Sequence, residues 1–260
     1  MRLQKKVAFI TGAARGIGKG VAIAYAKEGA ELILTDIRDD ILQQTVDEIR
    51  KFSKGRVIGY QMDAINSKQI KEVVAKSIAE FGKIDILVNN AGIIRLNLVV
   101  DMPEEEWDLV LNTNLKSAFL CSQAVVREMI RLNIQGKIVT TASLNSKEGE
   151  AYTSSYCASK HGILGLMKSL AYELAPYKIN VNCVCPGYVD TELQRGCEKV
   201  EAEEKGKSVE EIRQYYVNKI PFGIMAQPED IAKVYVFLAS SDADYMTGQA
   251  VNVCGGAIMH

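Results

Sequence analysis

Short apolar runs alternate with longer amphipathic segments along the whole chain. The apolar runs, such as VAFIT at 7–11 and ELILTD at 31–36, have the length and character of buried strands. The segment that follows places Ile41, Val46 and Ile49 at the spacing of one helix face. Because strands that alternate with helices need crossovers, this pattern predicts an α/β fold with a parallel sheet and helices on both faces.

Glycine and proline residues mark the ends of the expected helices. Glycines stop the first three, Ser67 is expected to cap the third, and Pro103 and Pro228 stand in the first turns of two later ones. The expected helices are 16–29, 39–55, 67–82, 103–132, 154–175 and 228–240. The expected strands are 7–11, 31–36, 56–63, 84–92, 136–143, 178–187 and 248–256.

No linker or repeat divides the chain, so we expect one catalytic domain over 1–260. The segment 188–220 departs from the alternation, because most of it is charged, with apolar residues at helical spacing. We interpret it as a lid over a substrate site. Its charged residues are expected to form a solvated helix face rather than to bind substrate; they are Glu201, Glu203, Glu204, Lys205 and Lys207.

Composition excludes several functional classes. The net charge is −1, so no overall field favours nucleic acid or an anionic membrane, and no apolar stretch has membrane-spanning length. Six cysteines form no C-x-x-C pair, which argues against zinc or any other metal site, and Cys183 and Cys185 are expected in the core. With two histidines a Ser-His-Asp triad would need His161, which we expect on a helix face. We expect a reduced, cytoplasmic protein.

A glycine-rich loop follows the first strand and opens the first helix. It reads TGAARGIG at 11–18, in which Gly12 allows a tight turn while Gly16 and Gly18 allow close approach of a phosphate and of helix to strand. The helix N-terminus would bind the pyrophosphate of a dinucleotide. The spacing departs from the common G-x-G-x-x-G.

Asp36 ends the second strand, where a carboxylate accepts hydrogen bonds from the adenosine ribose. The same charge repels the 2′-phosphate of NADP, so we expect NAD. Arg15 and Arg38 favour NADP instead, because either could pair with that phosphate. Asp63 ends the third strand and is placed for the adenine edge, or else it caps the next helix.

Tyr156 and Lys160 lie four residues apart, on one face of a predicted helix. A free tyrosine has a pKa of about 10, which must fall for proton exchange near neutral pH. A lysine ammonium at ~4 Å could supply the required stabilisation of the phenolate.

Together, these motifs resemble the short-chain dehydrogenase/reductase family over nearly the whole chain. Further matching motifs are NNAG at 89–92, Asn114 in NTNLKSAF, Ser143 in IVTTAS and PGYVDT at 186–191. The resemblance implies a Rossmann-type doubly wound parallel sheet of seven strands, in the order 3-2-1-4-5-6-7. Departures are Ala142 where a second serine is frequent, and Ile224 and Met225 where an arginine is common.

The resemblance also implies roles for individual residues. Tyr156 would be the general acid/base, Lys160 would lower its pKa and hold the nicotinamide ribose, and Ser143 would bind the substrate oxygen. Asn114, rather than Asn112, would hold a water that links Lys160 to solvent. Residues expected at the cofactor are Gly12, Arg15, Gly16, Ile17, Gly18, Asp36, Asp63, Ala64, Asn90, Ala91, Gly92, Tyr156, Lys160, Pro186, Gly187, Val189 and Thr191.

Substrate choice is expected in loops above the sheet, where Asn145 and Glu150 could bind hydroxyls beside Ser143 and Tyr156. Segments such as VEEIRQYYVNKIPFG resemble polyol dehydrogenases, so we expect a polyol/ketose pair. Acetoin/butanediol dehydrogenase and 3-oxoacyl-carrier-protein reductase are the alternatives. The second is disfavoured because Leu132, Asn133, Ile134 and Tyr172 stand where that group places basic residues. A catalytically silent nucleotide sensor is the alternative outside enzymes.

Two long helices, about 108–133 and 154–175, carry more apolar positions than one sheet face can cover. Members of the family pair these helices across a two-fold axis, so we expect a homotetramer. The apolar positions are Leu120, Val125, Met129, Leu166 and Leu170.

Overall fold

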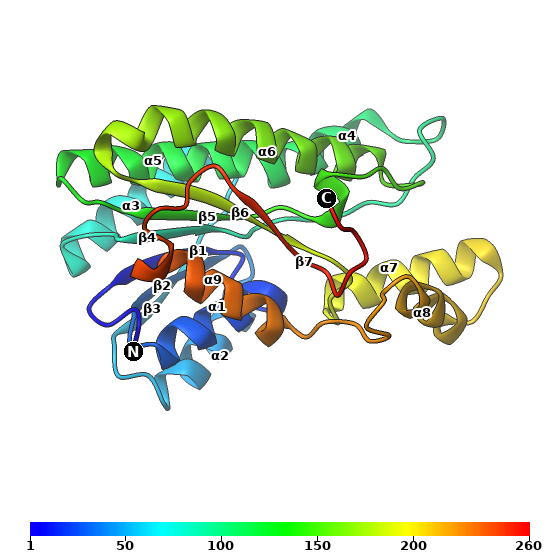
Figure 1. The fold of residues 1–260 in the computed structure, drawn as a ribbon, viewed down its shortest axis with the longest axis horizontal. Helices are drawn as coiled ribbons and strands as arrows, with labels where there is room; N and C mark the ends of the chain where they lie inside the picture. Colours follow the sequence, from blue (N-terminus) through cyan, green and yellow to red (C-terminus); the bar gives the residue numbers. More distant parts are fainter.

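Seven parallel strands form one sheet in the order β3-β2-β1-β4-β5-β6-β7, which confirms the predicted doubly wound fold (Figure 1). The computed structural model describes all of residues 1–260. The first two strands have the predicted bounds, and the other five are shorter than predicted, because the ladder ends where the chain turns into a loop. They are β1 Val7–Thr11, β2 Glu31–Asp36, β3 Val57–Gln61, β4 Ile86–Asn89, β5 Lys137–Thr141, β6 Asn180–Pro186 and β7 Ala250–Val253.

Both faces of the sheet are covered, which explains why its central strands are buried along their length. Alternate side chains of β1 enter opposite cores: Phe9 joins one and Ile10 the other. Helices α1, α2 and α9 lie on one face, and α3, α5 and α6 on the other (Figure 1). Cys183 and Cys185 are buried free thiols in the second core, as expected.

The helices follow the predicted pattern with three differences. Asn66, not Ser67, caps α3, because its side chain accepts from the amides of Lys68 and Gln69. Pro103 precedes α4 instead of standing in its first turn. The long helix expected at 103–132 is interrupted by a π-helical turn, η1, at Asn112–Lys116. The helices are α1 Gly16–Lys27, α2 Asp39–Arg50, α3 Ser67–Phe81, α4 Glu104–Leu111, α5 Ser117–Arg131, α6 Ser154–Leu174, α7 Glu192–Lys205, α8 Val209–Asn218 and α9 Pro228–Ala239, with short 3-10 turns at η2 Leu144–Ser146, η3 Ala175–Tyr177 and η4 Ser241–Ala243.

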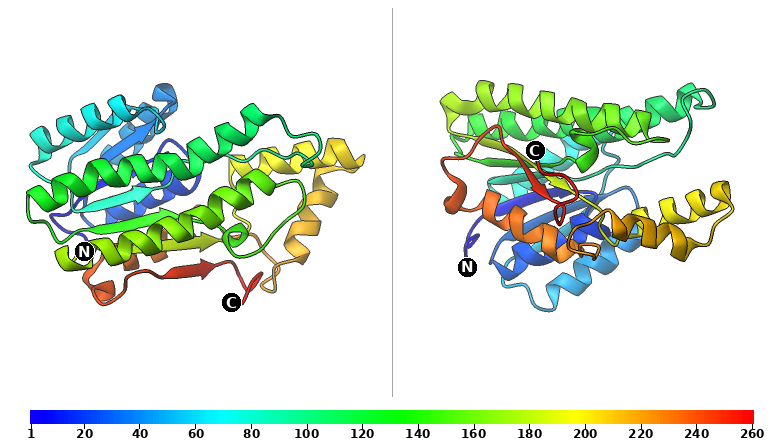
Figure 2. Two further views of the ribbon diagram at one scale, coloured as in Figure 1. Left: turned by 90° about the horizontal axis from the view of Figure 1, so that it is seen from above. Right: turned by 45° about the vertical axis from the view of Figure 1, so that its right-hand side comes forward.

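Helices α7 and α8 project beyond the sheet at one end (Figure 2). They have a small core of their own, in which Ile212 and Tyr216 of α8 pack with Ala202 of α7. The expectation of a fully solvated charged face is wrong for Glu201, which is buried and accepts from the Tyr216 hydroxyl at 2.5 Å. The other four charged residues of that set are exposed.

Two of the apolar residues expected at a subunit interface belong to the core. Val125 and Met129 are fully buried between α5 and the sheet, so they offer no surface to a second chain. Leu120, Leu166 and Leu170 are half-buried against the same core. None of the helices has both the length and the apolar character that a membrane crossing requires.

Candidate active site

A cavity of about 590 Å³ opens at the carboxyl ends of the parallel strands. The loops after β1, β2, β3, β4, β5 and β6 all contribute to its wall, as expected for a site at this edge of a doubly wound sheet. Of the residues predicted for the cofactor, the chemistry and the substrate, only Gly18 and Asn114 do not line it.

The glycine loop is shaped by close backbone contacts. Gly12 has a φ of +63°, and a Cβ on it would lie 2.8 Å from the Cα of Ala91. A Cβ on Gly18 would lie 2.1 Å from the carbonyl oxygen of Gly12, so this glycine lets α1 pack on the loop without facing the cavity. Asn90 fixes the loop, because its side-chain amide donates to the Gly12 carbonyl oxygen at 2.9 Å.

The amides at the start of α1 have no side-chain cap, since Arg15 occupies the cap position without a hydrogen bond to them. Such a helix start favours an anion. The glycine loop, which has no side chains in the way, and the uncapped amides of α1 fit the pyrophosphate of a nicotinamide dinucleotide. The carboxylate of Asp36 at the end of β2 fits its ribose. Pro186, Gly187, Val189 and Thr191 line the cavity beyond the catalytic residues, where they could contact the nicotinamide end.

Asp36 and the two arginines have different partners. The carboxylate of Asp36 accepts from the amides of Ala14 and Arg38, each at 3.1 Å. The Arg15 guanidinium forms an ion pair with Glu192 at the start of α7, whereas Arg38 has no ion-pair partner. Asp63 accepts from the amide of Ile65 at 3.1 Å, so it shapes the loop after β3 rather than capping α3.

Tyr156, in the first turn of α6, is the candidate acid/base. Burial raises the pKa of its hydroxyl to about 12, and a hydrogen bond with Ser143 partly opposes that rise. Burial outweighs the groups that lower this pKa, and the lowering expected from Lys160 stays a prediction. A buried phenol of this kind stays protonated near neutral pH and can act as a proton donor.

Lys160 lies one helical turn beyond Tyr156 and is buried. Its ammonium donates to the carbonyl oxygen of Thr141 at 2.7 Å and lies 5.5 Å from the centre of the Tyr156 ring. Burial lowers the pKa of Lys160 to about 8, because a buried ammonium loses its hydration. Lys160 therefore loses its positive charge as the pH rises through about 8.

Asn114 lies in the π-helical turn and is 1 % exposed. Its carboxamide accepts from the Ile93 amide at 2.8 Å and donates to the Ile93 carbonyl oxygen at 2.9 Å and to the Ser159 hydroxyl at 3.0 Å. Ser159 in turn donates to the Tyr156 carbonyl oxygen at 2.7 Å. Asn114 thus links the loop after β4 to the catalytic helix, and its relay role stays a prediction.

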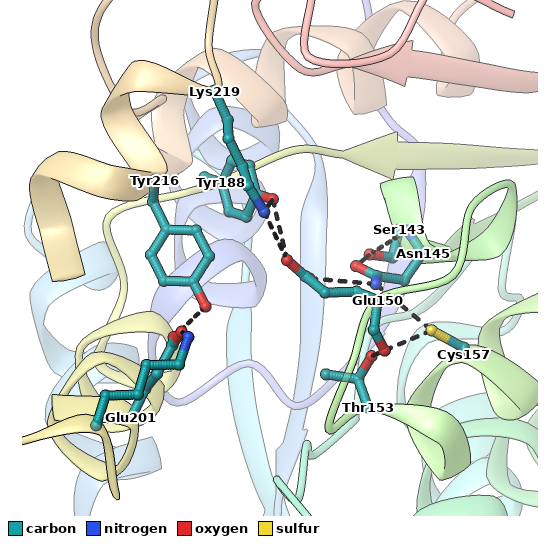
Figure 3. A network of polar contacts seen from close by, with 10 residues as sticks. Ser143, Asn145, Glu150, Thr153, Cys157, Tyr188, Glu201, Tyr216 and Lys219 are labelled. Carbon is teal, nitrogen blue, oxygen red and sulfur yellow. Dashed lines mark hydrogen bonds and ion pairs between the residues drawn. The ribbon is translucent and has the colours of Figure 1, made fainter. Parts of the chain in front are cut away.

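Ser143 and the residues predicted for the substrate belong to one polar network (Figure 3). The Asn145 amide N–H donates to the Ser143 hydroxyl at 3.1 Å, and the Asn145 carboxamide donates to Glu150 at 3.4 Å. The other oxygen of Glu150 accepts from the ammonium of Lys219 at 3.1 Å and from the hydroxyl of Tyr188 at 3.4 Å. Glu150 therefore connects the catalytic loop to the lid.

The sequence analysis missed Tyr188, Tyr216 and Lys219. The Lys219 ammonium lies 4.5 Å from the centre of the Tyr215 ring and 5.6 Å from that of Tyr216, so aromatic faces surround it. These residues lie 38 and more positions from Glu150 in the chain. Tyr216 and Lys219 belong to the aromatic cluster in RQYYVNK, and Tyr188 belongs to the PGYVDT motif, but neither segment by itself indicates a contact with Glu150.

Comparisons with known proteins agree with this geometry. A family model described as enoyl-(acyl carrier protein) reductase matches residues 12–258. The chain is 41% identical over 259 residues to 3-oxoacyl-(acyl-carrier-protein) reductase FabG of Thermotoga maritima, with 100% of both chains covered. It is 39% identical over 257 residues to (2S)-{(R)-hydroxy(phenyl)methyl}succinyl-CoA dehydrogenase subunit BbsD of Thauera aromatica, with 98% of both covered.

Two solved structures share the fold. A short-chain type dehydrogenase/reductase from Mycobacterium marinum superposes with a TM-score of 0.89 at 37% identity, covering 99% of this chain and 97% of the other. An actinorhodin polyketide ketoreductase variant with NADPH superposes with a TM-score of 0.93 at 33% identity, covering 97% of each chain.

Proposed function

The chain belongs to the short-chain dehydrogenase/reductase family, and from this premise we propose that it reduces the 3-oxo group of an acyl thioester with a nicotinamide dinucleotide. The observation that carries the reaction is the meeting of Ser143, Tyr156 and Lys160 with the glycine loop in one cavity. The identity of the substrate draws on the relatives, whose names specify a 3-oxoacyl carrier and a coenzyme A thioester.

The protein residues handle the proton and the developing charge. The Tyr156 hydroxyl donates a proton to the carbonyl oxygen of the substrate, while Ser143 donates a hydrogen bond to that oxygen. Lys160, as a buried cation, stabilises the phenolate that Tyr156 leaves behind. The reduced cofactor, when bound, supplies the hydride. A tyrosine whose pKa lies near 12 is suited to the reductive direction, in which it starts protonated.

The thioester interpretation replaces the polyol expectation of the sequence analysis. The relatives favour it, and so does the lining of the substrate end of the cavity. Apolar side chains line part of this end beside the polar network of Glu150, and they offer contacts to an acyl chain; they are Ile94, Leu96, Leu109, Leu144 and Leu193.

For the cofactor we propose NAD(H), on the strength of Asp36. Its carboxylate stands at the end of β2 and Arg15 is neutralised by Glu192, so only Arg38 is free to meet a 2′-phosphate. The NADPH in the polyketide ketoreductase argues for NADP in that relative. Steady-state assays with both reduced cofactors decide between them.

We propose that the chain assembles as a homotetramer through the face of α5 and α6. Val125 and Met129 lie in the core, but other apolar side chains of α5 and α6 are exposed. They include Phe119, Ile130 and Tyr172. Sedimentation at micromolar protein would give the mass of four chains, and a monomer would refute the assembly.

The function is tested by assaying acetoacetyl-CoA, an acetoacetyl N-acetylcysteamine thioester, acetoin and sorbitol or its ketose, each with both cofactors. We expect the 3-oxo thioesters to have the highest kcat/KM. Preferential turnover of the polyol would restore the earlier interpretation, and no turnover of any ketone would favour a nucleotide-sensing protein.

A further inference from the structure

Some of the charged side chains that line the cavity form ion pairs within the protein. Glu192 is paired with Arg15, and Glu150 is paired with Lys219 across the lid. Lys160 is buried against the Thr141 carbonyl oxygen and belongs to the chemistry. The charges that are left are therefore informative about ligands, because a built cavity that keeps an unmatched cation favours an anion.

Arg95 is the unmatched cation of the substrate end. It follows β4 on the loop that also places Ile94 and Leu96 in the cavity wall. Its guanidinium makes no ion pair, and its one hydrogen bond within the protein goes to the neighbouring Ile94 carbonyl oxygen at 3.0 Å. Four of the five N–H donors of the guanidinium are thus left for another partner.

The position of Arg95 follows from the contacts of its loop. The Asn97 amide donates to the carbonyl oxygen of Tyr152 at 2.9 Å, which holds the loop beside the start of α6. Arg95 is exposed and lines the same cavity as Cys197 of α7. It therefore lies towards the substrate end, whereas Arg38 is hydrogen bonded to Asp36 at the end of β2.

We propose that Arg95 is a specificity-determining residue that binds an oxyanion on the substrate, a phosphate or a carboxylate, away from the reacting carbonyl. The planar fork of donors suits either group. The inference rests on one part of the proposed function, the reduction of a substrate carbonyl. It does not depend on that substrate being a thioester. It explains why the carboxylate of Glu150 is held by Lys219 and Tyr188, because a free carboxylate at the same entrance would repel such a substrate.

The test compares substrates that carry an anionic group with related substrates that lack it. One pair is acetoacetyl-CoA and the acetoacetyl N-acetylcysteamine thioester, which lacks the phosphates. The second pair is levulinate and methyl levulinate, which differ in a carboxylate. We expect wild type to prefer the charged member of at least one pair, and Arg95→Gln to raise its KM by about 10- to 100-fold, the effect of losing a charge-assisted hydrogen bond. The KM of the neutral member should change less than about two-fold, which is within the usual effect of a surface substitution.

Two further variants serve as controls. Arg95→Lys should restore part of the preference, because it keeps the charge without the fork. Arg38→Gln removes a cation from the cofactor end of the same cavity, so it should change the KM of the cofactor but not the charged-to-neutral ratio. NADH binding followed by fluorescence shows that each variant is folded.

The pair that responds identifies the anion as phosphate or carboxylate. An Arg95→Gln effect equal on both members of each pair, or a wild type that prefers the neutral members, overturns the inference. If neither thioester is reduced but levulinate shows the expected dependence on Arg95, the proposed thioester function fails while the role of Arg95 stands.

Discussion

The two ends of the cavity are built by different means. At the proposed cofactor end, backbone forms most of the wall: glycines leave room, the start of α1 has uncapped amides, and Asn90 holds the loop in place. At the substrate end, side chains from β5–α6, β6–α7 and α8 meet in one polar network around Glu150. A backbone site is fixed once the strands pair, whereas a side-chain site depends on how the lid packs.

This difference has consequences for mutation. The cofactor end should respond to substitutions that add atoms or change the charge at a strand end. The substrate end should respond to changes in contacts between segments that are distant in sequence. The chemical step lies between the two, on a helix that both ends share, and its residues should give the largest effects.

Tyr156→Phe should have the largest effect on turnover. The ring still packs, so only the proton-donating hydroxyl is lost, and general acid catalysis is typically worth about 10²–10⁴-fold. We expect kcat to fall by that factor or more while NADH affinity stays within a few-fold. Steady-state rates beside NADH fluorescence check this. Retention of more than about a tenth of the activity would be a loss well below that range and would exclude Tyr156 as the acid.

Lys160→Met should lower both turnover and cofactor affinity, because the ammonium of Lys160 is expected to stabilise the Tyr156 phenolate and to contact the cofactor. In wild type, Lys160 is charged below its pKa of about 8 and neutral above it, while Tyr156 stays protonated up to about 12. Ketone reduction should therefore decline as the pH rises through about 8. The variant should lose this step in its pH profile as well as most of its activity. A step that persists in Lys160→Met would assign the titration to another group.

Asp36→Ser should affect only the cofactor end. Removing the carboxylate should shift preference from NADH towards NADPH by roughly 1–3 kcal/mol, the scale of a hydrogen bond to a charged group. The ratio of kcat/KM for the two cofactors measures this, with Arg38→Gln as the opposing control. A wild type that already prefers NADPH would show that Arg38 outweighs Asp36.

Lys219→Met should have the smallest effect and should be confined to the substrate end. The Glu150–Lys219 pair is partly exposed, so its contribution to stability is about 0–1 kcal/mol. We expect KM for the ketone to rise a few-fold with little change in kcat or in NADH binding. Glu150→Gln, which keeps the bond to Asn145, should have an effect of similar size. A large fall in kcat in either variant would show that the network positions Ser143 for the chemical step.

The same contrast explains what could be predicted. Gly12, Gly16 and Asp36 carry their role in residue type and in their position after a strand, so the cofactor end follows from the sequence. Glu201 illustrates the opposite case, because the nearby glutamates Glu203 and Glu204 are exposed and only the packing of α8 on α7 buries Glu201 against Tyr216. The prediction of Val125 and Met129 at an interface is wrong for a similar reason. Helical spacing does not reveal how many of the apolar residues of α5 the sheet buries.

By itself, the sequence determined the alternation of strands and helices, and through its resemblance the sheet order and the catalytic tyrosine–lysine pair. These are local properties: hydrophobic period, chain reversal at glycine, and residues four apart on one helix. Only the tertiary structure decided the π-helical turn at Asn114, the burial that sets the pKa values of Tyr156 and Lys160, and the isolation of Arg95. Burial and pairing depend on segments far apart in the chain, and their distances exist only once the chain has folded.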